Sequence, residues 1–226
     1  MAGTVKEVRV IEINESVYAD NERSAAAIRE MLAAKGVLFL NFMSGPGSGK
    51  TTLLTALINR LKGEMKIGEM DVDIESSLDA QRVADATGVE SVQIHNGGLC
   101  HVDADMVARA LMQVDTDGLD LLILENIGNL VCPAEFDTGA HRRIALLSVP
   151  EGHDKPLKYP LMFETCDLIL ITKMDTVDFF DFDVEKARQY IHEANPQAEV
   201  ILTSAKTGEG LEELVNWIRN EKRKLS

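Results

Sequence analysis

The segment SGPGSGKTT, residues 44–52, is the feature that most constrains this chain. It follows a continuous apolar run, VLFLNFM, and precedes an amphipathic stretch, LLTALINRLKG, so it lies between a predicted strand and a predicted helix. In such a loop, closely spaced glycines let the backbone curl so that its N–H groups point inward at a phosphate. The segment therefore predicts a phosphate-binding loop at the start of an α/β domain.

The residue types of this loop suit a nucleoside triphosphate. The pattern G-x-x-x-x-G-K-[ST] is missed by one position, because Ser44 stands where its first glycine would be. The second half is intact, so we expect Lys50 to reach the β and γ phosphates and the Thr51 hydroxyl to bind Mg²⁺. The predicted nucleotide-binding residues of the loop are Gly45, Gly47, Ser48, Gly49, Lys50, Thr51 and Thr52.

Further apolar runs of strand length alternate with helical patterns along the rest of the chain. The runs are 119–125, 143–149, 167–172 and 199–204, and the helical segments lie near 77–87, 102–114, 183–194 and 209–224. Continuous apolar runs indicate strands that are buried on both faces, and hence a mostly parallel sheet flanked by helices. The weaker run 66–73 alternates acidic with apolar or glycine residues, which predicts an edge or half-exposed strand. The expected fold class is α/β, a P-loop NTPase.

Two later segments indicate the base. TKMD, residues 172–175, closes a predicted strand and resembles the [NT]KxD motif of P-loop GTPases, in which the aspartate accepts from guanine N1–H and the exocyclic amine. Adenine offers neither donor, so Asp175 would discriminate against it. SAKTGEG, residues 204–210, resembles the GTPase loop that binds guanine O6. The predicted base-binding residues are Lys173, Asp175, Ser204, Ala205 and Lys206, which makes GTP with Mg²⁺ the expected ligand.

The chain divides into two predicted parts. Residues 1–36 are charged and carry apolar side chains at helical spacing up to Gly36, which predicts an N-terminal helical extension outside the main fold. Residues 37–226 form the predicted P-loop GTPase domain.

The predicted switch residues depart from the common GTPase pattern. In LDLLILENIGN, Glu125 stands where the aspartate of DxxG would be, and no glutamine follows Gly128. Asp73 and Asp79 could bind Mg²⁺ or orient water, or be surface acids. Without a recognisable water-positioning residue or arginine finger, unassisted hydrolysis is expected to be slow, of order 10⁻⁴ to 10⁻² s⁻¹. The predicted catalytic residues are Lys50, Asp73 and Glu125, with Thr51 and Asp73 as ligands of Mg²⁺.

Three other residues could bind a softer metal. Cys100 and His101 stand together at the start of a helical segment, and Cys132 precedes a proline just after ENIGN. Thiolate and imidazole suit Zn²⁺ or Ni²⁺. A buried cysteine beside an exposed histidine accounts for the same residues, so the spacing alone leaves both interpretations open. Cys166 leads into an apolar strand, which predicts a packed thiol.

Seven segments, taken in order, resemble the HypB family, GTPases of the SIMIBI class that help deliver nickel during [NiFe] hydrogenase maturation. They are GPGSGKTTLL, DVDIESSLDAQR, GGLCHVDAD, LILENIGNLVCPAEFDTG, SVPEGHDKPLKYPLMF, ITKMD and SAKTGEG, within residues 37–220. The resemblance implies that Cys100, His101 and Cys132 bind Zn²⁺ or Ni²⁺ at a dimer interface that nucleotide promotes. It also implies the nickel chaperone HypA and the hydrogenase large-subunit precursor as partners.

The chain also departs from that family. Some members carry an N-terminal CxxCGC site or a histidine-rich tract, and this chain has neither, so high-affinity nickel storage is not expected. Val72 stands where a glycine usually precedes the switch aspartate, and Glu69 occupies a normally apolar strand position. We therefore expect a local difference in switch geometry.

The net charge of the chain disfavours two classes of partner. The sequence has 37 acidic and 23 basic residues, a formal net charge of −14, which repels phosphate backbones and anionic lipids. Neither nucleic acid nor membrane is expected as a partner. No run of 18 apolar residues or secretory signal is found, and three cysteines cannot form a disulfide framework, so the expected location is the cytoplasm.

Other functions remain to be distinguished. The urease maturation GTPases typically show Cys-Pro-His and ESGG where this chain has CH at 100–101 and ENIG at 125–128. A nickel- or zinc-buffering module with a structural GTP site is a second alternative. An ATP-dependent small-molecule kinase is disfavoured by Asp175.

Overall fold

The computed structural model describes residues 14–72 and 78–225, and within these ranges one parallel sheet of seven strands forms the centre of the molecule. Its strand order is β3-β2-β4-β1-β5-β6-β7. The strands are β1 (Leu38–Ser44), β2 (Ile67–Val72), β3 (Glu90–Ile94), β4 (Leu121–Gly128), β5 (Arg142–Ser148), β6 (Leu168–Thr172) and β7 (Glu199–Leu202). All of the pairings are parallel, which confirms the predicted α/β class.

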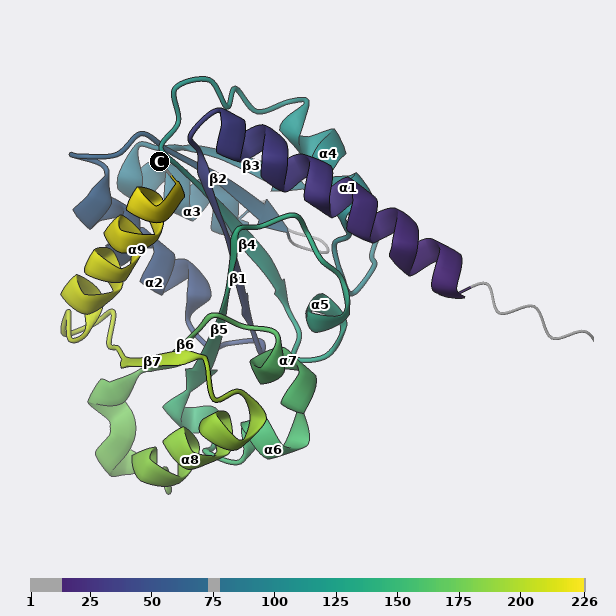
Figure 1. The fold of residues 1–226 in the computed structure, drawn as a ribbon. Coiled ribbons are helices and arrows are strands. Elements are labelled where there is room, and N and C mark those ends of the chain that lie inside the picture. The colour runs from purple at the N-terminus through teal and green to yellow at the C-terminus, as the bar shows by residue number, and fades with distance from the viewer. Residues whose placement is uncertain (1–13, 73–77, 226) are drawn as a thin grey trace, which may run out of the picture.

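Helices cover both faces of this sheet (Figure 1). They are α1 (Asn14–Ala34), α2 (Lys50–Leu61), α3 (Leu78–Thr87), α4 (Ala104–Leu111), α5 (Cys132–Glu135), α6 (Lys155–Lys158), α7 (Pro160–Glu164), α8 (Val184–Ala194) and α9 (Leu211–Leu225), with 3₁₀ turns at Val149–Glu151 and Met174–Phe179. Among the described residues, no helix combines the length and apolar character needed to cross a bilayer.

The alternation of side chains along β1 explains why two layers of helices are needed. Leu38, Leu40 and Phe42 belong to a buried cluster with α2 and α9. Phe39 belongs to a second cluster, with α1 and α4. Because successive residues of a strand point to opposite faces, a strand that is apolar throughout is stable only when both faces are covered.

Helix α1 is the described part of the predicted extension, and it packs on the sheet. Ala25, Ile28 and Leu32 are almost fully buried in the cluster shared with α4. Arg29 donates to an Asp137 carboxylate oxygen at 2.7 Å, which ties α1 to the loop after α5. The helix therefore adds apolar contacts to the core, while the domain boundary at residue 36 stays a prediction.

The prediction for the run 66–73 was wrong. Strand β2 is buried along its whole length, because it pairs with β4 on one side and with β3 on the other. The edge strand on this side of the sheet is β3, which the apolar runs did not predict, because its residues are only partly buried. A different prediction is confirmed, since Cys166 is buried and its Sγ donates to the Met162 carbonyl at 3.0 Å.

Truncation of Leu32 tests the contribution of α1. Leu32→Ala removes a fully buried side chain, so the free energy of unfolding should fall by about 2–5 kcal/mol in urea titrations followed by circular dichroism. Met31→Ala is the matched control, because Met31 is 41% exposed and its change should stay within about 0.5 kcal/mol. Equal stability of the two variants would show that α1 adds nothing to the core.

Candidate functional site

The loop between β1 and α2 has the backbone of a phosphate-binding loop. Gly47 and Gly49 have φ of 72° and 92°, a region that glycine enters without steric cost. Helix α2 begins at Lys50, directly after Gly49. Its first N–H groups have no partner within the helix and carry partial positive charge, so this end of α2 favours an anion.

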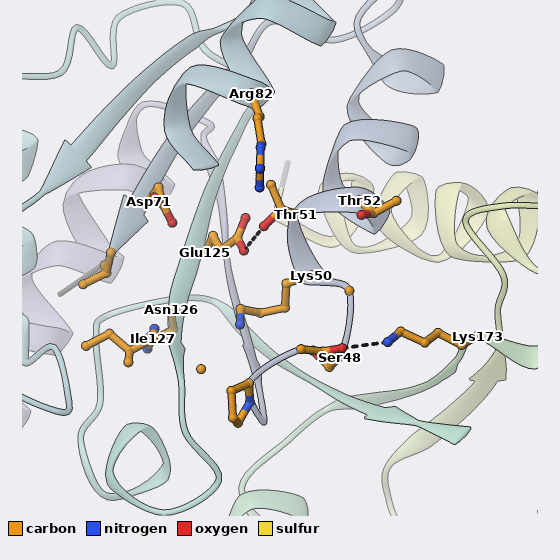
Figure 2. A pocket seen from close by; sticks show the side chains of 15 residues that line it. Ser48, Lys50, Thr51, Thr52, Asp71, Arg82, Glu125, Asn126, Ile127 and Lys173 are labelled. Carbon is orange, nitrogen blue, oxygen red and sulfur yellow. Dashed lines mark hydrogen bonds between the residues drawn. The ribbon is translucent and has the colours of Figure 1, made fainter. Parts of the chain in front are cut away.

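A cavity of about 590 Å³ lies against this loop (Figure 2). It is lined by Pro46, Gly47, Ser48, Gly49, Lys50, Thr51, Thr52, Asp71, Val72, Arg82, Glu125, Asn126, Ile127, Gly128 and Lys173. Most of the predicted phosphate-binding residues are thus brought together. Gly45 is an exception, because it is buried beside the Glu151 side chain rather than at the cavity wall.

The polar side chains of the loop are held by hydrogen bonds. Lys50 Nζ donates to Ser44 Oγ at 2.9 Å, and Ser48 Oγ donates to the same oxygen at 2.6 Å. Ser44, which replaces the first glycine of the motif, therefore helps to place the lysine. On the other side of the cavity, Thr51 Oγ1 donates to Glu125 Oε1 at 2.8 Å, as the dashed line in Figure 2 marks. A hydroxyl and a carboxylate are the oxygen ligands that suit Mg²⁺.

Three buried carboxyl groups lie close together, and one of them, Glu125, accepts from Thr51. Glu69, Asp71 and Glu125 each offer an oxygen, and these oxygens lie within 4.8 Å of one another. The pairing of β2 with β4 causes this, since it places Asp71 opposite Glu125. Burial is the main cause that raises the pKa of Glu69 to about 8; the negative charges of Asp71 and Glu125 add to the shift, and a hydrogen bond from Ser91 opposes it.

The predicted base-binding residues form a second group at the ends of β6 and β7. Ser204 Oγ donates to Asp175 Oδ1 at 2.7 Å, and Lys206 Nζ lies 3.6 Å from Asp175 Oδ2. The Ser204 hydrogen bond holds the pKa of Asp175 below its usual value, so its carboxylate is an acceptor at neutral pH. Lys173 connects this group to the loop, because its Nζ donates to the Gly47 carbonyl at 2.7 Å (Figure 2). The neighbouring Ala205 is half-buried.

The two cysteines of the predicted soft-metal site lie side by side. Cys100 Sγ and Cys132 Sγ are 2.8 Å apart and neither is in a disulfide, while His101 Nδ1 lies 4.0 Å from Cys100 Sγ. The neighbouring Cys100 thiol raises the pKa of Cys132. A divalent cation displaces such thiol protons when it binds, so this set of sulfur and nitrogen donors fits Zn²⁺ or Ni²⁺.

Two of the acids predicted from the sequence cannot be placed in the site. Asp73 lies outside the described residues, and so does the side chain of Asp79. Their predicted roles toward Mg²⁺ and water stay predictions.

Comparison with known proteins identifies the family of this chain. Residues 38–202 match the family model described as CobW/HypB/UreG, nucleotide-binding domain. Hydrogenase maturation factor HypB of Escherichia coli K12 is 44% identical over 214 residues, which cover 95% of this chain and 73% of the relative. The probable HypB of Methanocaldococcus jannaschii is 40% identical over 211 residues, with 93% and 95% covered. The chain belongs to the HypB family.

Solved structures agree with this assignment to HypB. The crystal structure of HypB from Helicobacter pylori in complex with nickel matches with a TM-score of 0.86 and 39% identity, over 91% of this chain and 96% of that chain. The signal recognition particle 54 kDa protein from Aeropyrum pernix, in complex with GDP, matches with a TM-score of 0.56 at 14% identity. The second likeness covers 83% of this chain and 48% of that chain and concerns the fold alone, which agrees with the α/β architecture of a parallel sheet flanked by helices.

The sequence did not predict every residue of this HypB-family site. Arg82 lines the cavity from α3 and points toward Thr51 in Figure 2, although its motif was recognised only as part of the resemblance. Asp71 and Glu69 were interpreted as part of a half-exposed strand. A signal was present, because two acids at spacing two in one strand must share a face.

The buried Glu69 predicts an unusual dependence of stability on pH. Its pKa is higher in the folded chain than in the unfolded chain, so the folded state binds the proton more tightly, and stability should fall as pH rises from about 4.5 to about 8. Glu69→Gln removes this term and should raise the free energy of unfolding at pH 8 by on the order of 2–4 kcal/mol, with little effect at pH 5.

Urea titrations at the two pH values measure this difference. Glu90→Gln is the matched control, because Glu90 is exposed on the adjacent strand and should leave the profile unchanged. A Glu69→Gln profile parallel to that of the unaltered chain would contradict the assigned pKa.

Proposed function

We propose that this chain hydrolyses GTP and couples its nucleotide state to the delivery of nickel during [NiFe] hydrogenase maturation. The observation that carries the proposal is the placement of both sites along one segment. Glu125 lines the phosphate cavity from the second half of β4, and Cys132 follows seven residues later beside Cys100. A movement of Glu125 in response to the nucleotide can therefore shift Cys132 relative to Cys100 and His101.

The hydrolysis step follows from the cavity side chains. Lys50 would neutralise the β and γ phosphates, and the Thr51 hydroxyl and Glu125 carboxylate would hold Mg²⁺ together with Asp73. Mg²⁺, when bound, supplies charge neutralisation at the phosphate oxygens. Asp175 would accept from guanine N1–H and the exocyclic amine, because its carboxylate is ionised at neutral pH and it lies in the 3₁₀ turn that follows β6.

Nickel is the proposed cargo of Cys100, His101 and Cys132. Three ligands from one chain leave a coordination position that a second copy can fill, which supports a homodimer promoted by GTP and metal. The Helicobacter pylori relative in complex with nickel supports the choice of this metal, and the donor atoms also fit Zn²⁺. HypA and the hydrogenase large-subunit precursor are the proposed cytoplasmic partners.

One alternative has an observation in its favour. A Helicobacter pylori relative, 39% identical over 217 residues, is named hydrogenase/urease maturation factor HypB. Delivery of nickel to a urease is therefore a second candidate function. The other alternative, a buffering module with a structural GTP site, differs from both because it would not hydrolyse GTP.

Turnover separates a GTPase from a buffering module. Phosphate release from GTP with Mg²⁺ should be slow, of order 10⁻⁴ to 10⁻² s⁻¹, and Lys50→Ala should lower it by about 10²-fold or more. Lys155→Ala, at the start of the short helix α6, is the matched control and should keep the rate. Absence of turnover in the unaltered protein, both alone and with its partner, would favour the buffering module.

Base specificity has its own test. Asp175→Asn should weaken GTP at least tenfold and shift preference toward xanthosine triphosphate, because an amide presents a donor where guanine N1–H needs an acceptor. Asp178→Asn, an exposed change in the same turn, is the control for competition assays with labelled GTP. Equal binding of ATP and GTP to the unaltered protein would disprove the role of Asp175.

A further inference from the structure

Asn21, on α1, makes hydrogen bonds to both segments that carry the proposed metal ligands. Its Nδ2 donates to the Asp137 carbonyl at 3.0 Å, and its Oδ1 accepts from the Ala104 N–H at 2.8 Å. Asp137 lies five residues after Cys132, and Ala104 lies three residues after His101. One side-chain amide therefore connects two loops that are far apart in the sequence.

We infer that Asn21 is a positioning residue for the metal site, an inference that rests on the proposed function. The site needs donor atoms from the loop before α4 and from α5 at a fixed separation. Asn21 contributes no donor to a metal. It acts on the backbone of both segments instead, and so restrains how far Cys132 can move from Cys100.

The chemistry of Asn21 fits this task. An amide carries a donor and an acceptor in one planar group, which an alcohol or a carboxylate does not offer in the same geometry. Ala104 is the first residue of α4, and N–H groups in a first helical turn have no partner within the helix. Asn21 is only 9% exposed, so removing its amide leaves two backbone groups without their partner in a mostly dry environment.

A stack of rings adds a second contact from the same helix. Tyr18, one turn before Asn21, lies with its ring centroid 5.7 Å from that of Phe136. Phe136 in turn stacks on the His101 imidazole, with centroids 4.0 Å apart and planes 8° from parallel. Helix α1, which runs beside α4 in Figure 1, thus restrains both the backbone and the ring plane of the ligand segments.

The expected effect is a loss of metal affinity without a loss of nucleotide affinity. Residues that orient metal ligands typically contribute 10–100-fold to affinity. Because Asn21 acts through the backbone, we expect the lower end of that range. Asn21 does not line the phosphate cavity, so the affinity for a GTP analogue should not change.

Titration with Co²⁺ measures this effect, because thiolate ligation gives charge-transfer absorption and the visible bands report coordination geometry. Asn21→Ala should weaken Co²⁺ about tenfold in competition with a chelator and alter the visible bands. Asn21→Asp keeps the acceptor for the Ala104 N–H and loses the donor, so its Co²⁺ affinity should lie between those of the unaltered protein and Asn21→Ala. Ser24→Ala is the matched control, because Ser24 Oγ donates to Asp105 Oδ1 of α4 and so does not connect the two ligand segments. Its Co²⁺ affinity should stay within twofold of that of the unaltered protein.

Cys132→Ala separates the inference from the proposed function. If Cys132→Ala leaves Co²⁺ affinity and charge-transfer absorption unchanged, the metal site and the role of Asn21 are both overturned. If Cys132→Ala removes them while Asn21→Ala binds Co²⁺ like the unaltered protein, the site stands and the positioning role is overturned. An equal loss in Asn21→Ala and Ser24→Ala would show a general effect of α1 packing and would overturn it as well.

Discussion

The parallel pairing of β1 with β4 is the constraint on which both sites depend. It sets Phe42 opposite Glu125 and Ser44 opposite Gly128, so the phosphate-binding loop and the end of β4 leave the sheet at the same edge. The two loops then touch, because a Cβ on Gly128 would lie 3.0 Å from Pro46 Cα. Thr51 and Glu125 meet across this contact, and the chain continues from there to Cys132.

The helices around this edge stabilise it in different ways. Helix α2 brings its N-terminus to the phosphate cavity and fills the core with its apolar face. Helix α1 packs on the opposite face, where it joins the segments of the soft-metal site through Asn21. The buried acids Glu69, Asp71 and Glu125 work against stability, since carboxyl groups out of water are costly to ionise. Residues that cost stability beside a cavity are typical of functional sites.

Local patterns in the sequence predict much of the fold and of the phosphate-binding site. Strands such as β1 and β6 are apolar throughout, so their length and burial follow from their own residues. The phosphate-binding loop with Lys50 and Thr51 can likewise be predicted from its own adjacent residues. The burial of β2 could not be predicted in this way, because it depends on pairing with β3, which is weakly apolar, and with β4, which is distant in the chain. The contacts of Asn21 lie 83 and 116 residues away, and no spacing rule connects them.

The most direct test of the proposed coupling is the affinity for nickel in two nucleotide states. Allosteric coupling energies are typically 1–3 kcal/mol, or about 5- to 150-fold in affinity, and linkage makes the effect reciprocal. Competition with a chromogenic chelator should give dissociation constants for Ni²⁺ that differ at least fivefold between GDP and a non-hydrolysable GTP analogue. Identical constants in both states would leave GTP without influence on the metal and would contradict the account.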